Sequence, residues 1–298
     1  MRKKKQHVIP NCYLKGWCDP RTPPGHHPFI WRISKDGAQR KKRSPEKSFT
    51  GADRYTIKLP NGQRNLLLED TLAGVEDGFV RVLRRVRRQD RLNALDRARL
   101  CVFATAMLTR TTAFGEHWTK QFQELHEQVL ALEKAHNAEP TTSKQTARFV
   151  EQAQQRVIAT SLKTAAPLLF RMPLTILVTQ DQLGFITSDN PCVWFNPKWY
   201  RLPPFYRSPG LAQEDIEVTL PLTPHHLLLI SHRSYPLYLP VKQKTVDELN
   251  RRTRFFCTEE FVSWKGETRP YWFDPGKEPE DTWEKSEGGK RAMAESGI

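Results

Sequence analysis

A long helical tract in the middle of the chain is the feature that most constrains the fold. Over residues 66–91, apolar side chains recur every three or four positions, which is the period of a helix with one buried face. Similar patterns continue over 96–117, 116–137 and 143–169. The sequence on either side consists of short apolar runs bounded by Pro, Gly and Asn. We therefore predict an α+β fold in which a helical bundle, about residues 66–170, is inserted between two strand-rich ends.

The two strand-rich ends are expected to build a mixed, mainly antiparallel sheet. N-terminal strands are predicted at 29–33 and 53–59, and a late helix is predicted at 245–256. The C-terminal strands are predicted at 174–178, 216–220, 227–231 and 261–264, with a hairpin at 185–195. The chain is therefore divided into four segments. The first three, 1–65, 66–170 and 171–268, are expected to form one domain together, and the fourth, 269–298, is expected to be a polar, disordered tail.

The strong positive charge of the chain predicts a polyanionic partner. The net charge is +14 and the isoelectric point is about 9.7. A chain this basic usually meets nucleic acid, and a membrane surface is the second candidate. The simpler alternative is that the charge only keeps the surface hydrated.

Two basic segments and one aromatic loop could contact nucleic acid. The basic segments are a loop at 40–47, expected to be mobile, and the C-terminal half of the first long helix. The aromatic loop, 196–215, could stack single-stranded bases or could close as a lid on its own side chains. The candidate binding residues are Lys41, Lys42, Arg43, Arg84, Arg88, Trp199 and Tyr200.

Cysteine usage and hydropathy predict a cytoplasmic protein without a membrane span. The five cysteines form no C-x-x-C pair and their number is odd, so a zinc ribbon and a disulfide framework are not expected. The basic start Met1-Arg2-Lys3-Lys4-Lys5 has no apolar run behind it, so we do not interpret it as a signal peptide. No apolar stretch approaches the roughly 18 residues that a membrane-spanning helix needs.

The polar segment Thr187-Ser188-Asp189-Asn190-Pro191 is the strongest candidate site. It lies between two apolar runs, which predicts a strand, a tight turn and a second strand. Ser, Asp and Asn side chains can bond to nearby backbone, and proline restricts the residue before it, so this turn is expected to be rigid. It offers a carboxylate, an amide and two hydroxyls in one place.

Other polar residues could join this turn from distant parts of the chain. His7 precedes Pro10 at the start of an ordered segment. Glu69 and Glu76 fall on the shoulder of the apolar face of the first long helix, where they could reach a site while the helix packs. Arg110 lies near the end of the second helix. Each of these residues could instead have an ordinary structural role.

The pattern of these residues resembles a known bacterial family. The motifs that carry the resemblance are His7-Val8-Ile9-Pro10 with Tyr13-Leu14 and Trp17, Tyr55, Glu69 and Glu76, Arg110-Thr111, Phe185-Ile186-Thr187-Ser188-Asp189-Asn190-Pro191, and Leu220-Pro221-Leu222-Thr223-Pro224. Together they resemble the domain-of-unknown-function 4238 family over most of residues 5–260. Trp17 stands where phenylalanine is commoner, and Thr112 stands where proline is expected. The resemblance implies no reaction, but it implies that these polar residues belong together.

A metal-dependent nuclease is the leading functional hypothesis. Carboxylates from Glu69, Glu76 and Asp189 would hold Mg²⁺ or Mn²⁺, which commonly work with phosphates. Arg110 would stabilise developing negative charge, and His7 would transfer a proton. Ser188 and Asn190 complete the predicted catalytic set. Such a phosphodiesterase would act on DNA or RNA, and it would suit a defence or toxin-like effector.

Three alternatives remain open at this point. The first is a nucleic-acid-binding or adaptor protein without catalysis, in which Glu69–Arg110 and Asp189–Arg110 pairs form a structural ion-pair network. The second is a metal-free ribonuclease, because Arg110 and His117 match the loose Arg-x4–6-His signature of the HEPN superfamily. The third is a hydrolase that uses Ser188 or Cys192, although Ser188 lacks a G-x-S-x-G context.

Overall fold

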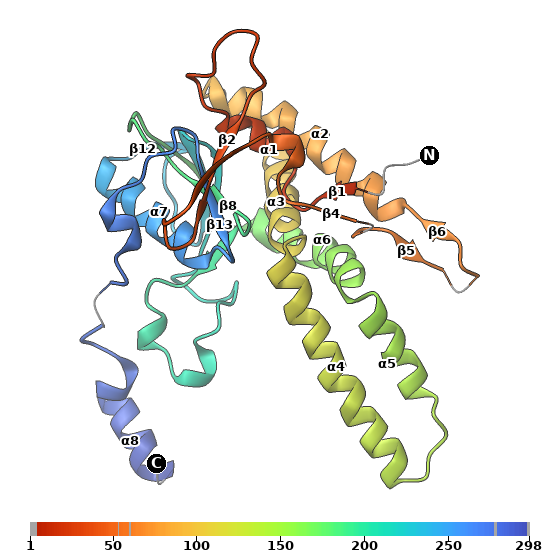
Figure 1. Cartoon of the computed structure of the whole chain (residues 1–298). Helices are drawn as coiled ribbons and strands as arrows, with labels where there is room; N and C mark the ends of the chain where they lie inside the picture. Colours follow the sequence, from red (N-terminus) through yellow and green to blue (C-terminus); the bar gives the residue numbers. More distant parts are fainter. Residues whose placement is uncertain (1–4, 53, 60, 277–278, 297–298) are drawn as a thin grey trace.

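The computed structural model of the chain has an α+β fold (Figure 1). It describes residues 5–52, 54–59, 61–276 and 279–296. The predicted combination of a central helical region with mixed, mainly antiparallel sheets is confirmed. The basic start at residues 1–4 lies outside the described residues.

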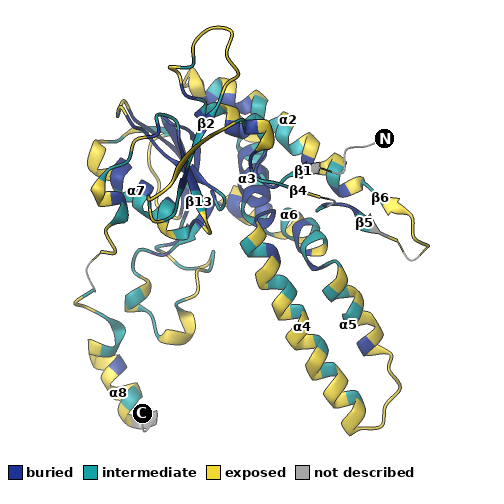
Figure 2. Cartoon of the chain, viewed as in Figure 1, coloured by how far each residue is buried: buried dark blue, intermediate teal, exposed yellow. Residues whose placement is uncertain are grey.

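The helical region contains a packed part and a projecting part. Helices α2 (Leu67–Arg87), α3 (Ala94–Thr109) and α6 (Ala153–Arg171) pack against one another. Helices α4 (Thr112–Ala135) and α5 (Thr142–Glu151) extend away from the rest as a two-helix arm (Figure 1). Figure 2 shows that most of this arm is exposed or intermediate in burial. The bundle predicted over 66–170 is therefore only partly a bundle.

Helix boundaries in this region follow local capping chemistry. The Asn93 side chain accepts the Asp96 amide while the Asp96 side chain accepts the Asn93 amide, and this capping box starts α3. The Thr111 side chain caps α4 in the same way, by accepting the Phe114 amide. These caps explain why the single helix predicted over 96–117 is two helices that meet at Arg110. The helix predicted over 143–169 is likewise divided at Gln152.

The larger sheet is formed by the C-terminal half of the chain. Its strand order is β12-β7-β11-β10-β9, and every pair is antiparallel except β12 with β7. The strands are β7 (Leu174–Val178), β9 (Val193–Phe195), β10 (Glu217–Thr223), β11 (His226–Ser231) and β12 (Tyr238–Pro240). Helix α7 (Gln243–Phe256) follows the last of these strands.

A second sheet combines both ends of the chain. Its order is β3-β2-β13-β8, and all pairs are antiparallel. The strands are β2 (Ile30–Ser34), β3 (Arg40–Arg43), β8 (Thr187–Ser188) and β13 (Glu260–Ser263). Two short pairs, β1 (Lys5–His7) with β4 (Thr50–Ala52) and β5 (Ile57–Lys58) with β6 (Arg64–Asn65), complete the strands.

The hairpin predicted over 185–195 is wrong. Strand β8 pairs with β13 in the second sheet, whereas β9 pairs with β10 in the larger sheet. The residues between them, 189–192, therefore connect two sheets instead of turning one strand back on the other. Gly184 prepares this connection: it has a φ of +61°, and a Cβ there would lie 2.2 Å from the carbonyl oxygen of Pro224.

The N-terminal aromatic residues anchor the opening of the chain to this connection. Helix α1 (Asn11–Leu14) continues into the 3-10 turn η1 (Lys15–Trp17), and Tyr13 and Trp17 are fully buried. The Tyr13 hydroxyl lies 2.6 Å from the Thr187 hydroxyl and donates to the carbonyl of Pro221. The Trp17 indole donates to the carbonyl of Phe185. The opening of the chain, residues 185–187 and Pro221, all in segments that carry the family resemblance, therefore meet in the core.

The C-terminal segment is attached to the body of the protein at two places. Trp272, in η5 (Pro270–Phe273), is fully buried, so packed structure extends past the predicted boundary at 269. Farther on lie η6 (Trp283–Lys285) and α8 (Glu287–Ser296). Ion pairs Arg201–Asp281 and Arg207–Glu284 join this segment to the loop that contains η3 (Trp199–Arg201) and η4 (Pro204–Tyr206).

Candidate functional site

The polar turn after β8 is a structural clamp. The Asp189 carboxylate accepts the backbone amides of Thr258, Glu259 and Glu260, at 2.7 to 3.0 Å. The Asn190 amide donates to the carbonyl of Phe256, at the end of α7. These contacts satisfy the orphan groups where α7 ends and β13 begins. The predicted bonds of Asp189 and Asn190 to the backbone are present, and they hold the chain between α7 and β13.

Ser188 and Cys192 do not have the environment of nucleophiles. The Ser188 side chain is fully buried and its hydroxyl accepts the backbone amide of Asn190. Cys192 is also buried, and desolvation raises the pKa of its thiol to about 12. The thiolate that would attack a substrate is therefore strongly disfavoured.

A buried arginine organises a second polar cluster. Arg110 is only 3% exposed, and its Nη1 lies 2.8 Å from Glu76 Oε1. Its Nη2 donates to the carbonyl of His7 at 2.6 Å, and its Nε donates to the Tyr55 hydroxyl. Burial opposes the charge, but Tyr55 and Glu76 together raise the pKa of the guanidinium. This arginine network, Arg110 with Glu76, Tyr55 and His7, links β1, α2 and the end of α3.

Glu69 belongs to the same neighbourhood but has a different partner. Its Oε2 accepts a hydrogen bond from the Gln6 side-chain Nε2, and the Gln6 side-chain Oε1 accepts one from the backbone amide of Tyr55. Neither of the two predicted ion pairs, Glu69–Arg110 and Asp189–Arg110, is formed. Glu76 is the carboxylate that pairs with Arg110. The idea of a carboxylate–arginine network is supported, with a corrected membership.

The predicted convergence of Glu69, Glu76 and Asp189 is not what the structure has. The two glutamates contact Gln6 and Arg110, whereas Asp189 is occupied by the amides of residues 258–260. Across the described ranges of the chain, no three His, Cys, Asp or Glu side chains are grouped in a way that could hold a metal ion. The sequence could not reveal this separation, because it depends on tertiary packing. The glutamates of α2 face β1 and the end of α3, whereas Asp189 faces the start of β13.

The two candidate histidines lie in different surroundings. The His7 ring bonds to the backbone carbonyl of Glu46 at 3.1 Å, so its carbonyl, and not its imidazole, meets Arg110. His117 lies on α4 with its ring edge-on to Trp118. Since Arg110 is sealed in its network, the Arg110–His117 pair does not present the open acid–base site that a HEPN-like ribonuclease would use.

The basic segment at 40–47 is ordered, which corrects the predicted mobile loop. Arg40, Lys41, Lys42 and Arg43 form the edge strand β3, and all four are exposed. Lys42 lies directly across from Trp31, with its ammonium 5.0 Å from that ring and 4.8 Å from the Phe29 ring. The strand therefore presents cations on both faces, next to two aromatic rings.

The arginines of α2 add a second basic stripe. Arg84, Arg87 and the C-cap residue Arg88 are exposed. Arg87 and Arg88 follow Arg84 by three and four residues, so both lie on its side of the helix end, although Arg88 is paired with Asp90. This end of α2 approaches η1, because a Cβ on Gly16 would lie 3.9 Å from Arg87 Nη2.

The loop with Trp199 and Tyr200 is packed on its own side chains. The Arg207 guanidinium lies 5.5 Å from the Trp199 ring, and that of Arg201 lies 5.8 Å from the Tyr200 ring. Trp199 is 39% exposed, whereas Phe205 in the same loop is 89% exposed. The contacts of Trp199 and Tyr200 favour the alternative of a self-packed loop for these two residues, whereas Phe205 stays exposed.

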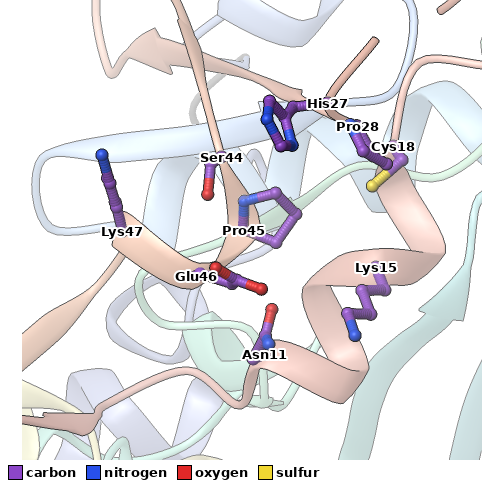
Figure 3. Close-up of a pocket in the computed structure, with 9 residues that line it drawn as sticks. All are labelled: Asn11, Lys15, Cys18, His27, Pro28, Ser44, Pro45, Glu46 and Lys47. Atoms are coloured by element: carbon purple, nitrogen blue, oxygen red, sulfur yellow. The ribbon is translucent and has the colours of Figure 1, made fainter. Parts of the chain in front are cut away.

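Two concave pockets flank the segment that follows β3. Pocket 1, about 660 Å³, is shown in Figure 3. Its polar lining comes from η1 and α1, from the segment after β3 and from the loop before β2, and consists of Asn11, Lys15, His27, Ser44, Glu46 and Lys47. Pocket 2, about 670 Å³, has charged lining residues of both signs, namely Arg32, Lys47, Arg54, Glu116, Asp189 and Glu259. Lys47 lines both pockets.

The family of the chain follows from a comparison with family models. A family model described as a protein of unknown function, DUF4238, matches residues 5–265. The chain belongs to the DUF4238 family. The matched range begins in β1 and ends just after β13, so it contains the arginine network, β3 and the clamp after β8. No curated protein and no solved structure gives a significant match.

Several residues of this DUF4238 chain escaped prediction from the sequence. Gln6, Asn11, Lys15 and Glu46 carried no recognisable signal, because each is a single polar residue in a short irregular segment. Tyr55 was visible only through the family resemblance.

Within the described residues, no helix has the length and apolar character needed to cross a bilayer.

Proposed function

We propose that this DUF4238 protein binds nucleic acid through a basic surface, and that the arginine network stabilises the fold without taking part in catalysis. The basic surface is defined as Arg40–Arg43 of β3, Lys15 and Lys47 of pocket 1, and Arg84, Arg87 and Arg88 of α2. The single observation that carries the proposal is β3: four consecutive cations on an ordered edge strand, all exposed. Such an arrangement suits contacts with successive phosphates.

The parts of the basic surface are connected. The chain runs from β3 directly into Ser44–Lys47, which form one wall of pocket 1, and Lys15 lies in the same pocket. Lys15 is next to Gly16, which approaches Arg87 of α2. A polyanion could therefore follow one path from β3 past pocket 1 to α2, and each phosphate contact would release bound counterions.

The ordered state of β3 favours binding over simple hydration. Strand pairing fixes its backbone, so the cations need not lose backbone freedom when they meet a ligand. Lys42 is held beside Trp31 and Phe29, which gives an aromatic surface next to the cations. Aromatic rings beside basic side chains are typical of single-strand binding, where bases stack and phosphates pair with cations.

The test is the salt dependence of binding to single-stranded and double-stranded DNA and RNA. For a single strand, the logarithmic slope against salt is about −0.7 for each neutralised phosphate. The variant K41Q/K42Q/R43Q should therefore reduce the slope by about 2 and weaken binding strongly at low salt. A matched control, K120Q/K134Q/K144Q, removes the same number of cations from the α4–α5 arm. Equal losses in both variants would show that only net charge matters and would overturn the proposal.

The metal-dependent nuclease stays a hypothesis that the same samples can examine. DNA and RNA are incubated with the wild-type protein and Mg²⁺ or Mn²⁺, and the products are separated by size. The carboxylates predicted as ligands are occupied by Gln6, Arg110 and backbone amides, so we expect binding without cleavage. Metal-dependent cleavage that Glu69→Ala and Asp189→Ala both abolish would replace our proposal with the nuclease.

A further inference from the structure

Pocket 1 holds polar groups that the fold itself does not use. The Asn11 side-chain oxygen is buried, and it has no hydrogen-bond partner. Within the described part of the chain, the Glu46 carboxylate and the Lys15 and Lys47 ammonium groups form no ion pairs. A buried acceptor without a donor is unfavourable in the folded chain, so groups of this kind commonly serve a ligand.

The acceptors and cations occupy different parts of the pocket. Figure 3 shows the Glu46 side chain directed toward Asn11, so two oxygen acceptors face the same space. Lys47 points away from them at the rim, and Lys15 lies on the facing helical turn. The remaining lining includes the apolar rings of Pro28 and Pro45, and the exposed imidazole of His27 adds a flat aromatic surface. The position of Glu46 is fixed because its carbonyl accepts from the His7 ring.

The geometry points to a nucleotide site: pocket 1 captures one unpaired nucleotide whose base carries an exocyclic amine, as adenine and cytosine do. Two hydrogens of such an amine would serve Asn11 and Glu46, one each. The base would lie against Pro45 and His27, and Lys15 and Lys47 would meet its phosphate. A cavity of about 660 Å³ lies within the range of ligand pockets, roughly 300–1,000 Å³.

This inference rests on the proposed function, because it specifies what the basic surface does with a bound strand. Arg43 is followed at once by Ser44 and Pro45, so a strand lying on β3 is led to the mouth of pocket 1. An unpaired base at that point could leave the path and enter the pocket. The protein would then prefer single strands or unpaired ends to continuous duplex.

The experiment compares AMP with IMP by isothermal titration calorimetry on the full chain. The two nucleotides differ at C6, which carries an amine in AMP and a carbonyl in IMP, and at the neighbouring N1, which carries a hydrogen only in IMP. The carbonyl would face the two acceptors with no hydrogen to give, and the single N1 hydrogen of IMP could serve only one of them. We expect AMP to bind at least about tenfold more tightly than IMP, with inorganic phosphate weaker than either. Equal affinities for AMP and IMP would overturn the inference, as would an AMP affinity no greater than that of phosphate.

Variants locate the effect in the pocket. Asn11→Leu and, separately, Glu46→Gln should each reduce the AMP preference over IMP; Glu46 is exposed, so its variant keeps the fold even if the Asn11 variant does not. The variant K41Q/K42Q/R43Q should lose oligonucleotide binding but keep AMP binding, because β3 does not line the pocket. Oligonucleotide binding without any AMP binding would overturn the pocket and leave the proposed function intact. AMP binding without oligonucleotide binding would overturn the proposed function and leave the pocket intact.

Discussion

Arg110 and the cations of β3 carry the same charge but have opposite environments. Arg110 is 3% exposed, and its guanidinium is used by a carboxylate, a hydroxyl and a carbonyl. Arg40–Arg43 are all exposed, on an edge strand. A buried cation survives only if all its donors are satisfied, so it fixes the positions of its partners. An exposed cation on a fixed backbone remains available to a ligand.

We therefore expect Arg110 to contribute to the stability of the fold and the cations of β3 to contribute to ligand binding. The arginine network holds β1, α2 and α3 together, whereas β3 can lose its charges without loss of packing. The predictions below use this separation, and they run from the largest expected effect on stability to the smallest.

The largest effect is expected for Arg110→Met. Removing the guanidinium leaves Glu76 without its ion-pair partner and takes one donor from the Tyr55 hydroxyl and one from the His7 carbonyl, which still bond to each other. Breaking one side of a buried ion pair costs about 3–5 kcal/mol, and we expect the lower end because Glu76 is 27% exposed and can be hydrated. Urea unfolding measures the loss. The double variant R110M/E76L should recover part of it, and a loss below about 1 kcal/mol for R110M would contradict the network.

The next effect is the pH dependence caused by His226. Burial, together with the nearby His225 and Arg87, lowers the pKa of His226 to about 4 from an ordinary 6.5. Because the folded pKa is the lower one, the unfolded chain binds the proton first. Stability from this group is full above pH 6.5 and is lost as the pH falls toward 4, by up to about 3 kcal/mol.

Unfolding at pH 7 and pH 4 tests this effect against the variant His226→Asn. The wild-type protein should lose more stability than the variant between the two values. His226 and Arg110 then form a matched contrast: a buried base with no carboxylate stays neutral, and a buried base with a carboxylate stays charged. Equal losses in both proteins would show that other groups dominate the acid response.

A smaller effect is expected for Asp189→Asn. The amide keeps one acceptor but turns an NH₂ group toward backbone amides that the carboxylate now accepts. A lost hydrogen bond of this kind costs about 1–2 kcal/mol. Thermal unfolding should show the decrease, and Asp36→Asn, in an exposed turn, serves as the control. If D189N matched the wild type, the clamp would not contribute to stability.

The smallest effect on stability is expected for K41Q/K42Q/R43Q. All three side chains are exposed, and no carboxylate pairs with them among the described residues. The melting temperature should remain within error of the wild type, while the salt slope of nucleic-acid binding falls. A clear fall in melting temperature would mean that β3 is part of the stabilising structure, and the separation between the two regions would fail.

The sequence predicted the elements better than their partners. Helix α2, strands β7 and β11 and helix α7 were expected close to where they lie, because each has a helical period or a continuous apolar run. Tyr13 and Trp17, which carry part of the family resemblance, are fully buried and anchor the opening of the chain in the core. The two strands around the polar turn were predicted, but their pairing was wrong, since sequence proximity favours a hairpin and only long-range packing places them in separate sheets.

The candidate site was predicted in its residues but not in its geometry. Angular positions on α2 placed Glu69 and Glu76 on the shoulder of the buried face, and both do contact residues of β1 or the end of α3. Which carboxylate meets Arg110 depends on how three elements pack, and a helical period carries no information on that. Pocket 1 was invisible because its walls come from three short segments without periodicity.

The connection between β8 and β9 also has a mechanical consequence. Four residues, 189–192, connect β8 of the second sheet to β9 of the larger sheet, and Asp189 and Asn190 hold them to the end of α7 and the start of β13. Because this connection is so short, a displacement of one sheet relative to the other would strain the backbone between β8 and β9. Insertions of even one residue should be poorly tolerated here, whereas the turn at 136–141, at the far end of the arm, should accept a peptide tag.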